Sequence, residues 1–146
     1  MLAAPGAQAE REEDDVNWVA VIVATVVSMA LGALWFSPVL FLKPWTALRP
    51  DKNPPSGNAS PMLYVITAVG ALVSALTLDW IIGLAHANTL AGGAIIGLYA
   101  GLGFVAPAIL SDNLFNERPI KLFLIVAGFP VVGLLAMGAI IGALGA

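Results

Sequence analysis

Residues 17–36, NWVAVIVATVVSMALGALWF, decide the fold of this chain. The stretch holds no charged residue, and about 20 mostly apolar residues is the length that a helix needs to cross the hydrocarbon core of a bilayer. Trp18 and Trp35 bracket it and would lie roughly 26 Å apart along a helix, with each indole at the headgroup level that tryptophan prefers. The stretch therefore predicts a transmembrane helix.

Three further charge-poor stretches of similar length follow, at about 62–84, 89–110 and 120–144. We therefore predict an all-α fold, an integral membrane bundle of four transmembrane helices. The bundle forms a single domain over residues 16–146 and follows an acidic tail at residues 1–15.

The composition supports the same class. Of 146 residues, 60% are hydrophobic and 10% are charged, against roughly 45–50% and about 25% in ordinary soluble domains. The chain has no cysteine and a net charge of -3. This composition argues against a small soluble globule, a disulfide scaffold, a thiolate metal site and a nucleic-acid-binding protein. We expect no metal site and no nucleic-acid partner.

Basic residues predict the orientation, because lysine and arginine in short loops stay on the cytoplasmic side. The loops after the first and third spans carry Lys43, Arg49, Lys52, Arg118 and Lys121, and the other face carries Arg11. We therefore expect both termini on the outer side.

The connections differ in length and composition. Residues 85–88 form a loop so short that the second and third spans should be antiparallel neighbours. Residues 37–61 form a cytoplasmic loop interrupted by prolines, and its part at 38–48 mixes large apolar residues with Lys43. We expect that part to lie in the membrane interface.

Small residues recur at helical spacing in every span, as they do where transmembrane helices pack closely. The stripes contain Ser28 and Gly32; Thr67, Gly70, Ser74 and Thr77; Gly93, Gly97 and Gly101; and Gly138 and Gly142. We expect these stripes to hold the four helices together, and the alternative is that one stripe docks a partner or a second copy. The pentapeptide GAIIG occurs at 93–97 and 138–142, which we attribute to composition and not to duplication.

Ionisable residues inside a membrane are costly and often functional. Asp79 lies about one turn below the predicted outer surface, where we expect a capping, anchoring or hydrogen-bonding role, with a proton or cation site as the alternative. We expect His86, the single histidine, to be solvated in its loop. The alternatives are a pair with Asp79 or an axial ligand to haem or a pigment.

Two prolines interrupt the predicted spans. Pro107 removes the hydrogen bond to the Gly103 carbonyl and Pro130 the one to the Val126 carbonyl, so both should kink their helices. Freed carbonyls can line a solute or lipid pocket, or the kinks can simply be packed. Tyr99 is one of the few polar residues near them.

Two blocks of sequence resemble a known family. The first is GALWFSP at residues 32–38, followed by Lys43 and Trp45. The second is GFVAP at 103–107, followed by NLF at 113–115, Arg118 and KLF at 121–123. Together they resemble a bacterial family of small four-helix membrane proteins classed as a domain of unknown function. The resemblance implies the fold and a membrane location, which we take as the bacterial inner membrane, and it implies no activity.

Both blocks fall at the cytoplasmic ends of the first and third spans. We expect any functional surface there, formed by Trp35, Ser37, Pro38, Pro107, Asn113 and Arg118.

We find no set of residues that predicts catalysis, so we expect a protein that is not an enzyme. The leading hypothesis is a structural or accessory subunit of a larger membrane assembly, such as an energy-transducing complex. Its partners would be membrane lipids and other subunits or a second copy, and we predict no cofactor beyond lipid. The alternatives are a homo-oligomeric transporter or channel for small solutes and a pigment- or haem-binding subunit.

Overall fold

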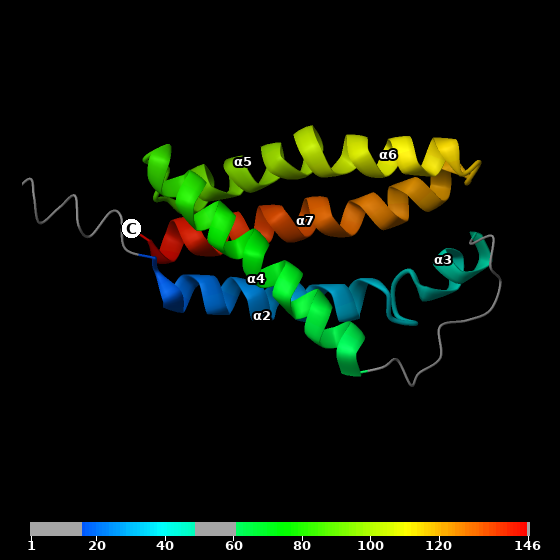
Figure 1. The fold of residues 1–146 in the computed structure, drawn as a ribbon, viewed down its shortest axis with the longest axis horizontal. Helices are drawn as coiled ribbons and strands as arrows, with labels where there is room; N and C mark the ends of the chain where they lie inside the picture. The colour runs from blue at the N-terminus through cyan, green and yellow to red at the C-terminus, as the bar shows by residue number, and fades with distance from the viewer. Residues whose placement is uncertain (1–15, 49–60, 146) are drawn as a thin grey trace, which may run out of the picture.

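A computed structural model describes residues 16–48 and 61–145 of the chain (Figure 1). Its long helices are α2 (Trp18–Trp35), α4 (Pro61–Leu84) and α7 (Ile120–Leu144) and a composite helix of α5 (Leu90–Ala100), the π-helical turn η1 (Gly101–Val105) and α6 (Ala106–Phe115). The short helix α3 (Leu42–Leu48) lies within the predicted interfacial segment. The acidic tail at 1–15 and the loop residues 49–60 lie outside the described residues.

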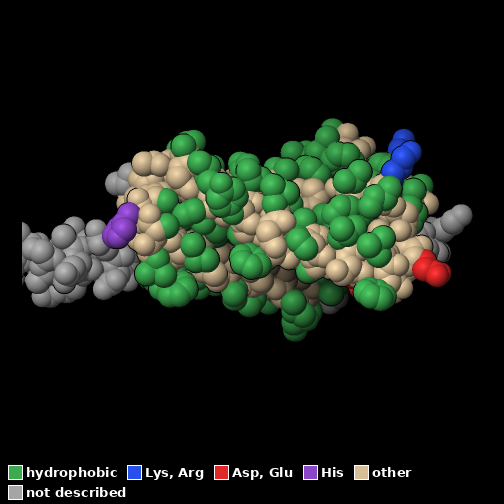
Figure 2. Space-filling model, turned by 90° about the horizontal axis from the view of Figure 1, so that it is seen from above, with side chains coloured by type: hydrophobic (Ala, Val, Ile, Leu, Met, Phe, Trp, Pro, Cys, Tyr) green, Lys and Arg blue, Asp and Glu red, His purple; other side chains and the backbone are tan. Residues whose placement is uncertain are grey.

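Four helices are long and apolar enough to cross a membrane, which confirms the all-α class and the four predicted spans. No more than 33% of any span's most apolar window is buried within the chain. Apolar side chains therefore cover the outside of the bundle, as a hydrocarbon solvent requires. Figure 2 shows them along the whole length of one face. The chain is accordingly a multi-pass membrane protein.

The third span runs to Phe115 and not to residue 110 as predicted. Ser111, Asp112 and Asn113 continue the helix, because polar side chains at the headgroup level are solvated and do not end it. The helix ends at Asn116 and Glu117, where Glu117 takes a positive φ of 54°. Pro119 then leads into α7, since proline suits the start of a helix.

Helix α7 is the centre of the bundle and contacts every other described helix. In Figure 1, α5 and α6 lie along one side of α7 and α2 along the other, while α4 crosses diagonally over α7 and α2. The turn between α4 and α5 is as short as expected, and the two helices contact one another. However, α7 is the main partner of α5, because α4 leaves α5 at an angle.

Glycines let α5 and α7 approach until their backbones touch. A Cβ atom on Gly93 would lie 2.0 Å from the Gly138 carbonyl oxygen, and one on Gly97 would lie 2.0 Å from the Leu134 carbonyl oxygen. In the other direction, a Cβ atom on Gly142 would lie 2.1 Å from the Thr89 carbonyl oxygen. The two GAIIG pentapeptides therefore face each other across this contact, and only glycine fits there.

A separate apolar core joins α2, α4 and α7. It contains small side chains from α2 and larger ones from α4 and α7, namely Ala20, Val21, Ala24, Ala75, Leu78, Ile82, Met137 and Ile141. On α2, Ser28 is buried as well, and a Cβ atom on Gly32 would lie 3.0 Å from the Phe129 ring. The small-residue stripe of the first span thus faces the rest of the bundle.

Asn17 ties the two chain ends of the bundle together. Its side-chain oxygen accepts a hydrogen bond from the Ala20 backbone N–H (3.2 Å), which caps α2, and its Nδ2 donates to the Leu144 carbonyl at the end of α7 (3.0 Å). The beginning of α2 and the end of α7 therefore lie side by side (Figure 1).

Candidate functional site

The turn between α6 and α7 is closed by a buried asparagine. The Asn113 side chain is 3% exposed, and its Nδ2 donates to the carbonyl oxygens of Arg118 (3.1 Å) and Pro119 (3.2 Å). The Pro119 carbonyl also accepts the backbone N–H groups of Leu122 and Phe123 in the first turn of α7, and the Arg118 carbonyl precedes that turn. Asn113 therefore satisfies the backbone of the turn, and its role is to position the residues around it.

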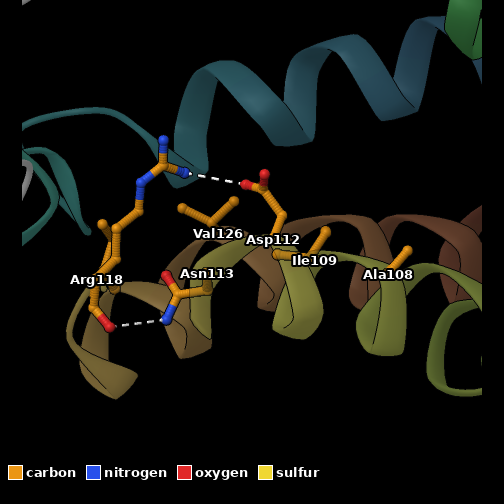
Figure 3. A pocket seen from close by; sticks show the side chains of 7 residues that line it. Ala108, Ile109, Asp112, Asn113, Arg118 and Val126 are labelled. Carbon is orange, nitrogen blue, oxygen red and sulfur yellow. Dashed lines mark hydrogen bonds and ion pairs between the residues drawn. The ribbon is translucent and has the colours of Figure 1, made fainter. Parts of the chain in front are cut away.

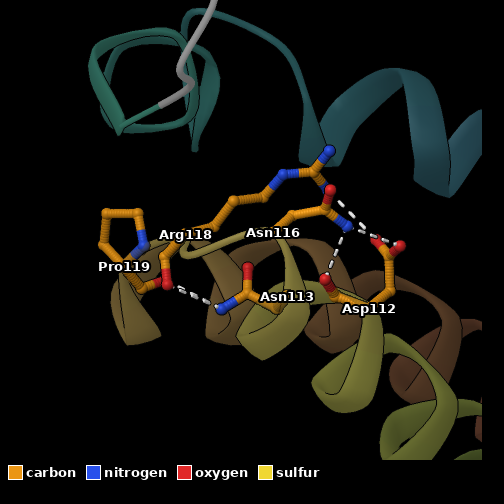
Figure 4. A network of polar contacts seen from close by, with 5 residues as sticks. All are labelled: Asp112, Asn113, Asn116, Arg118 and Pro119. Atoms are coloured by element: carbon orange, nitrogen blue, oxygen red, sulfur yellow. Dashed lines mark hydrogen bonds and ion pairs between the residues drawn. The ribbon is translucent and has the colours of Figure 1, made fainter.

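Three polar side chains surround this turn on its exposed side (Figure 4). An Arg118 Nη atom pairs with Asp112 Oδ2 at 3.1 Å. Asn116 Nδ2 donates to Asp112 Oδ1 (3.0 Å) and to the Asp112 carbonyl oxygen (2.8 Å). The Arg118 side chain thus runs back along α6 and places a guanidinium beside a carboxylate at the end of the bundle.

A half-open pocket of about 300 Å³ lies next to this ion pair. Asp112, Asn113 and Arg118 line its polar end, and Ala108, Ile109, Leu122 and Val126 line the rest. Figure 3 shows the apolar side chains of α6 and Val126 of α7 on the same side as the ion pair. The pocket therefore joins an apolar slot to one positive and one negative charge.

Trp35 anchors the end of α2 on α7. Its indole Nε1 donates to the Ile125 carbonyl oxygen at 2.9 Å, and its ring covers Gly128, where a Cβ atom would lie 2.8 Å from Trp35 Cζ2. The ring also packs against Phe41 with centroids 4.8 Å apart. Trp35 is therefore half-buried in a helix contact. The Ile125 carbonyl that it binds is adjacent to the Val126 carbonyl, which lacks its helical donor because Pro130 has no N–H.

The residues after Trp35 connect α2 to α3. The Ser37 hydroxyl donates to the Leu34 carbonyl oxygen at 2.6 Å, and Pro38 is exposed. The Phe36 ring lies 4.9 Å from the Trp45 ring of α3 and 5.9 Å from the Phe129 ring of α7. These aromatic contacts hold α3 against the end of the bundle.

The two span prolines occupy different settings. Pro107 is exposed, and the backbone before it forms the π-helical turn η1, in which the Ala106 N–H bonds to the Gly101 carbonyl. Such a turn accommodates a proline, which cannot donate a backbone hydrogen bond, within an otherwise continuous helix. Pro130 lies inside α7, which runs unbroken past it. The pocket is lined near Pro130 by Val126, whereas Pro107 does not line it.

The other predicted polar residues lie elsewhere. Asp79 is half-buried near the outer-side end predicted for α4 and faces the backbone N–H of Asn17. His86 is exposed in the α4–α5 turn with a φ of 51°, and no contact joins it to Asp79 within the described residues. Tyr99 is 69% exposed on α5 and does not line the pocket. Figure 2 shows the histidine at one end of the bundle and charged side chains at the other.

The small residues of α4 lie apart from the packed stripes. Gly70 is exposed, and a Cβ atom built on it would meet nothing within 4 Å. The hydroxyls of Thr67, Ser74 and Thr77 donate to carbonyls of their own helix, at Leu63, Gly70 and Val73. Gly70 and Ser74 therefore do not hold this helix to the rest of the chain. The face of α4 that packs inward carries Ala75, Leu78 and Ile82 instead.

Sequence reasoning singled out Asn113 and Arg118 but passed over Asp112, their partner in the pocket. A signal was present, since the run SDNLFNERP at 111–119 combines turn-forming residues with charges at a span end. Within the described residues, no group of three or more His, Asp and Glu side chains could hold a metal ion.

Comparisons with known proteins identify a family and no activity. A family model described as "Protein of unknown function (DUF1761)" matches residues 19–142. No curated protein and no solved structure matches the chain.

Proposed function

Because this chain belongs to the DUF1761 family of proteins of unknown function, we propose its role from its own structure: it is a non-catalytic structural or accessory subunit of a larger membrane protein assembly. An energy-transducing complex of the bacterial inner membrane is an example of such an assembly. We also propose that both termini lie on the outer side, because Lys43, Arg118 and Lys121 lie in α3, in the α6–α7 turn and at the start of α7, at the end of the bundle opposite to the start of α2 and the end of α7.

The observation that carries this proposal is the unused stripe of α4. Thr67, Gly70, Ser74 and Thr77 follow one side of the helix at steps of three and four, outside the face that packs inward. By contrast, Gly93 and Gly97 of α5 and Gly138 and Gly142 of α7 lie directly against backbone on the opposite side of the α5–α7 contact. One small-residue stripe is thus left without a partner in the described part of the chain.

Small residues on a lipid-facing helix are suited to another helix and not to lipid. They let two backbones approach, so that dispersion contacts and weak hydrogen bonds replace looser contacts with acyl chains. Large apolar side chains flank the stripe, among them Ile66 and Val73, which are 60% and 56% exposed. They would form the walls of a helix–helix contact. We therefore place a transmembrane helix of another subunit on this side of α4.

The distribution of polar groups favours a role as a subunit of a membrane complex over a role as an enzyme or a coupled transporter. The core of α2, α4 and α7 contains only apolar side chains. The described Asp, Glu, Lys, Arg and His side chains lie near the two ends of the bundle, where they are partly or fully exposed. A reaction or a coupled transport cycle ordinarily uses an ionisable group inside the membrane.

The proposal is tested on the tagged full chain extracted from native membranes in a mild detergent. We expect it to migrate with a larger assembly, and a lone monomer would overturn the proposal. Because the chain has no cysteine, Ser74→Cys introduces a unique reactive site in the stripe. It should cross-link to a different membrane protein. Val69→Cys, at an exposed position of the same helix outside the stripe, should not.

Two outcomes would favour the other candidate functions. A cross-link between two copies at Ser74→Cys, with solute flux in reconstituted liposomes, would favour a homo-oligomeric transporter. The Asp79→Asn and Tyr99→Phe variants would then test which polar groups the solute uses. A visible absorption band that His86→Ala removes would favour pigment or haem binding.

A further inference from the structure

We propose that the pocket beside the α6–α7 turn binds one phospholipid with a zwitterionic, amine-bearing headgroup of the phosphatidylethanolamine type. The headgroup phosphate would pair with Arg118 and the ammonium with Asp112. One acyl chain would lie against Ala108, Ile109 and Val126. This lipid site is independent of the partner that we place on α4.

The pocket lies at the depth where a lipid has its headgroup. The composite third span of 26 residues is about 39 Å long, which exceeds the roughly 30 Å hydrocarbon core. Its last turn, with Asp112, therefore extends to the headgroup level. Ala108 lies about 6 Å deeper along the same helix, at the level where an acyl chain begins.

The apolar part of the pocket has the shape of a slot and not of a flat lipid-facing surface. Leu122, which is 3% exposed, lines the pocket together with Ile109 and Val126, which come from two different helices. A volume of about 300 Å³ is at the lower end of the range found for ligand pockets. It suits part of one chain, with the remainder of the lipid in the bilayer.

The charges at the mouth favour a zwitterion over an anion. Arg118 uses one nitrogen on Asp112, and a guanidinium has five N–H donors, so others remain for a phosphate. Asp112 accepts one bond on each carboxylate oxygen, and each oxygen has a second lone pair for an ammonium. An anionic headgroup would meet the like charge of Asp112, with exposed Glu117 nearby.

The test is native mass spectrometry of the full chain in detergent, titrated with phosphatidylethanolamine or phosphatidylglycerol. We expect phosphatidylethanolamine to bind about tenfold more tightly, because only its ammonium pairs with Asp112. Arg118→Gln and Asp112→Asn should each weaken its binding about tenfold. The matched controls Lys121→Gln and Glu117→Gln remove the same charges from exposed neighbours that do not line the pocket, and they should leave binding unchanged.

A third variant tests the slot without touching the ion pair. Ala108 is exposed at the pocket, so Ala108→Phe can fill the slot without disturbing the core, and it should lower binding of both lipids. Phosphatidylglycerol that binds the unmodified chain as tightly as phosphatidylethanolamine would overturn the zwitterion assignment. So would phosphatidylethanolamine that binds Asp112→Asn as tightly as it binds the unmodified chain. A loss in Lys121→Gln equal to that in Arg118→Gln, or full binding by Ala108→Phe, would overturn the site itself.

Discussion

The Gly97→Ala substitution tests how α5 and α7 are held together. The added Cβ atom would lie 2.0 Å from the Leu134 carbonyl oxygen, whereas ordinary contacts begin at 3.4 Å. The two helices would have to separate by about 1.4 Å at this point. The obstacle is backbone, so no side-chain rotation relieves it, and overpacking of this kind costs about 1–3 kcal/mol. Alanine has a higher helix propensity than glycine, which offsets up to about 1 kcal/mol of this cost.

We therefore expect Gly97→Ala to lower the free energy of unfolding by about 2 kcal/mol, or roughly 30-fold in the folded-to-unfolded ratio. The assay is reversible unfolding in mixed micelles of mild detergent and dodecyl sulfate, followed by circular dichroism. Gly103→Ala is the control, because it lies on the same span and its Cβ atom would meet nothing within 4 Å. Equal stability of the two variants would refute the close contact of α5 with α7.

A double-mutant cycle sharpens the same test. A Cβ atom on Gly93 would contact the Gly138 carbonyl oxygen, and one on Gly138 would contact the Gly93 carbonyl oxygen. Once Gly93→Ala has separated the helices, Gly138→Ala costs less. The double variant should therefore lose at least about 0.5 kcal/mol less unfolding free energy than the sum of the two single variants. Additive losses would place the two glycines in separate contacts.

Three further predictions concern the end of the bundle near the pocket, each measured by the same unfolding assay. Trp35→Phe keeps an aromatic ring but removes the indole N–H that donates to the Ile125 carbonyl, and it should cost about 0.5–1.5 kcal/mol; a neutral result would contradict the anchoring role. Asn113→Ala should cost about 1–3 kcal/mol, because it removes both hydrogen bonds that the buried Nδ2 donates to the Arg118 and Pro119 carbonyls, whereas the exposed Asn116→Ala should cost less than about 0.5 kcal/mol. Glu117→Gly should stabilise the chain by up to about 1 kcal/mol, because its φ of 54° suits glycine, and a loss of stability would show that the side chain matters more than the backbone.

The sequence indicated several residues of the candidate site, but it did not indicate how the fold brings them together. The positions of Asn113 and Arg118 at a span end indicated the end of the bundle at which the pocket lies. The sequence did not indicate that Asn113 turns inward to close a turn, or that Arg118 reaches back to Asp112. Those facts depend on the path of the chain between α6 and α7. That path is set by a few hydrogen bonds that leave no periodic signal.

Pro107 and Gly70 illustrate two further differences between pattern and structure. A proline in a span predicts a missing hydrogen bond, and η1 is how this chain absorbs it, although the sequence alone did not distinguish a π-helical turn from a kink. A small residue on a span predicts close packing, but whether another helix occupies that side depends on where α4 crosses the bundle.

The sequence by itself determined the number and approximate bounds of the spans, because the backbone of four charge-poor stretches of membrane length can satisfy its hydrogen bonds in lipid only as helices. It also determined that the helices would pack closely, through glycines at helical spacing. Only the tertiary structure decided which helices meet, that α7 lies at the centre, and that one stripe and one pocket are left open. The physical reason is that these helices are apolar on every side, so hydrophobicity does not select an inward face. Shape complementarity between backbones and a few buried polar contacts make that selection instead.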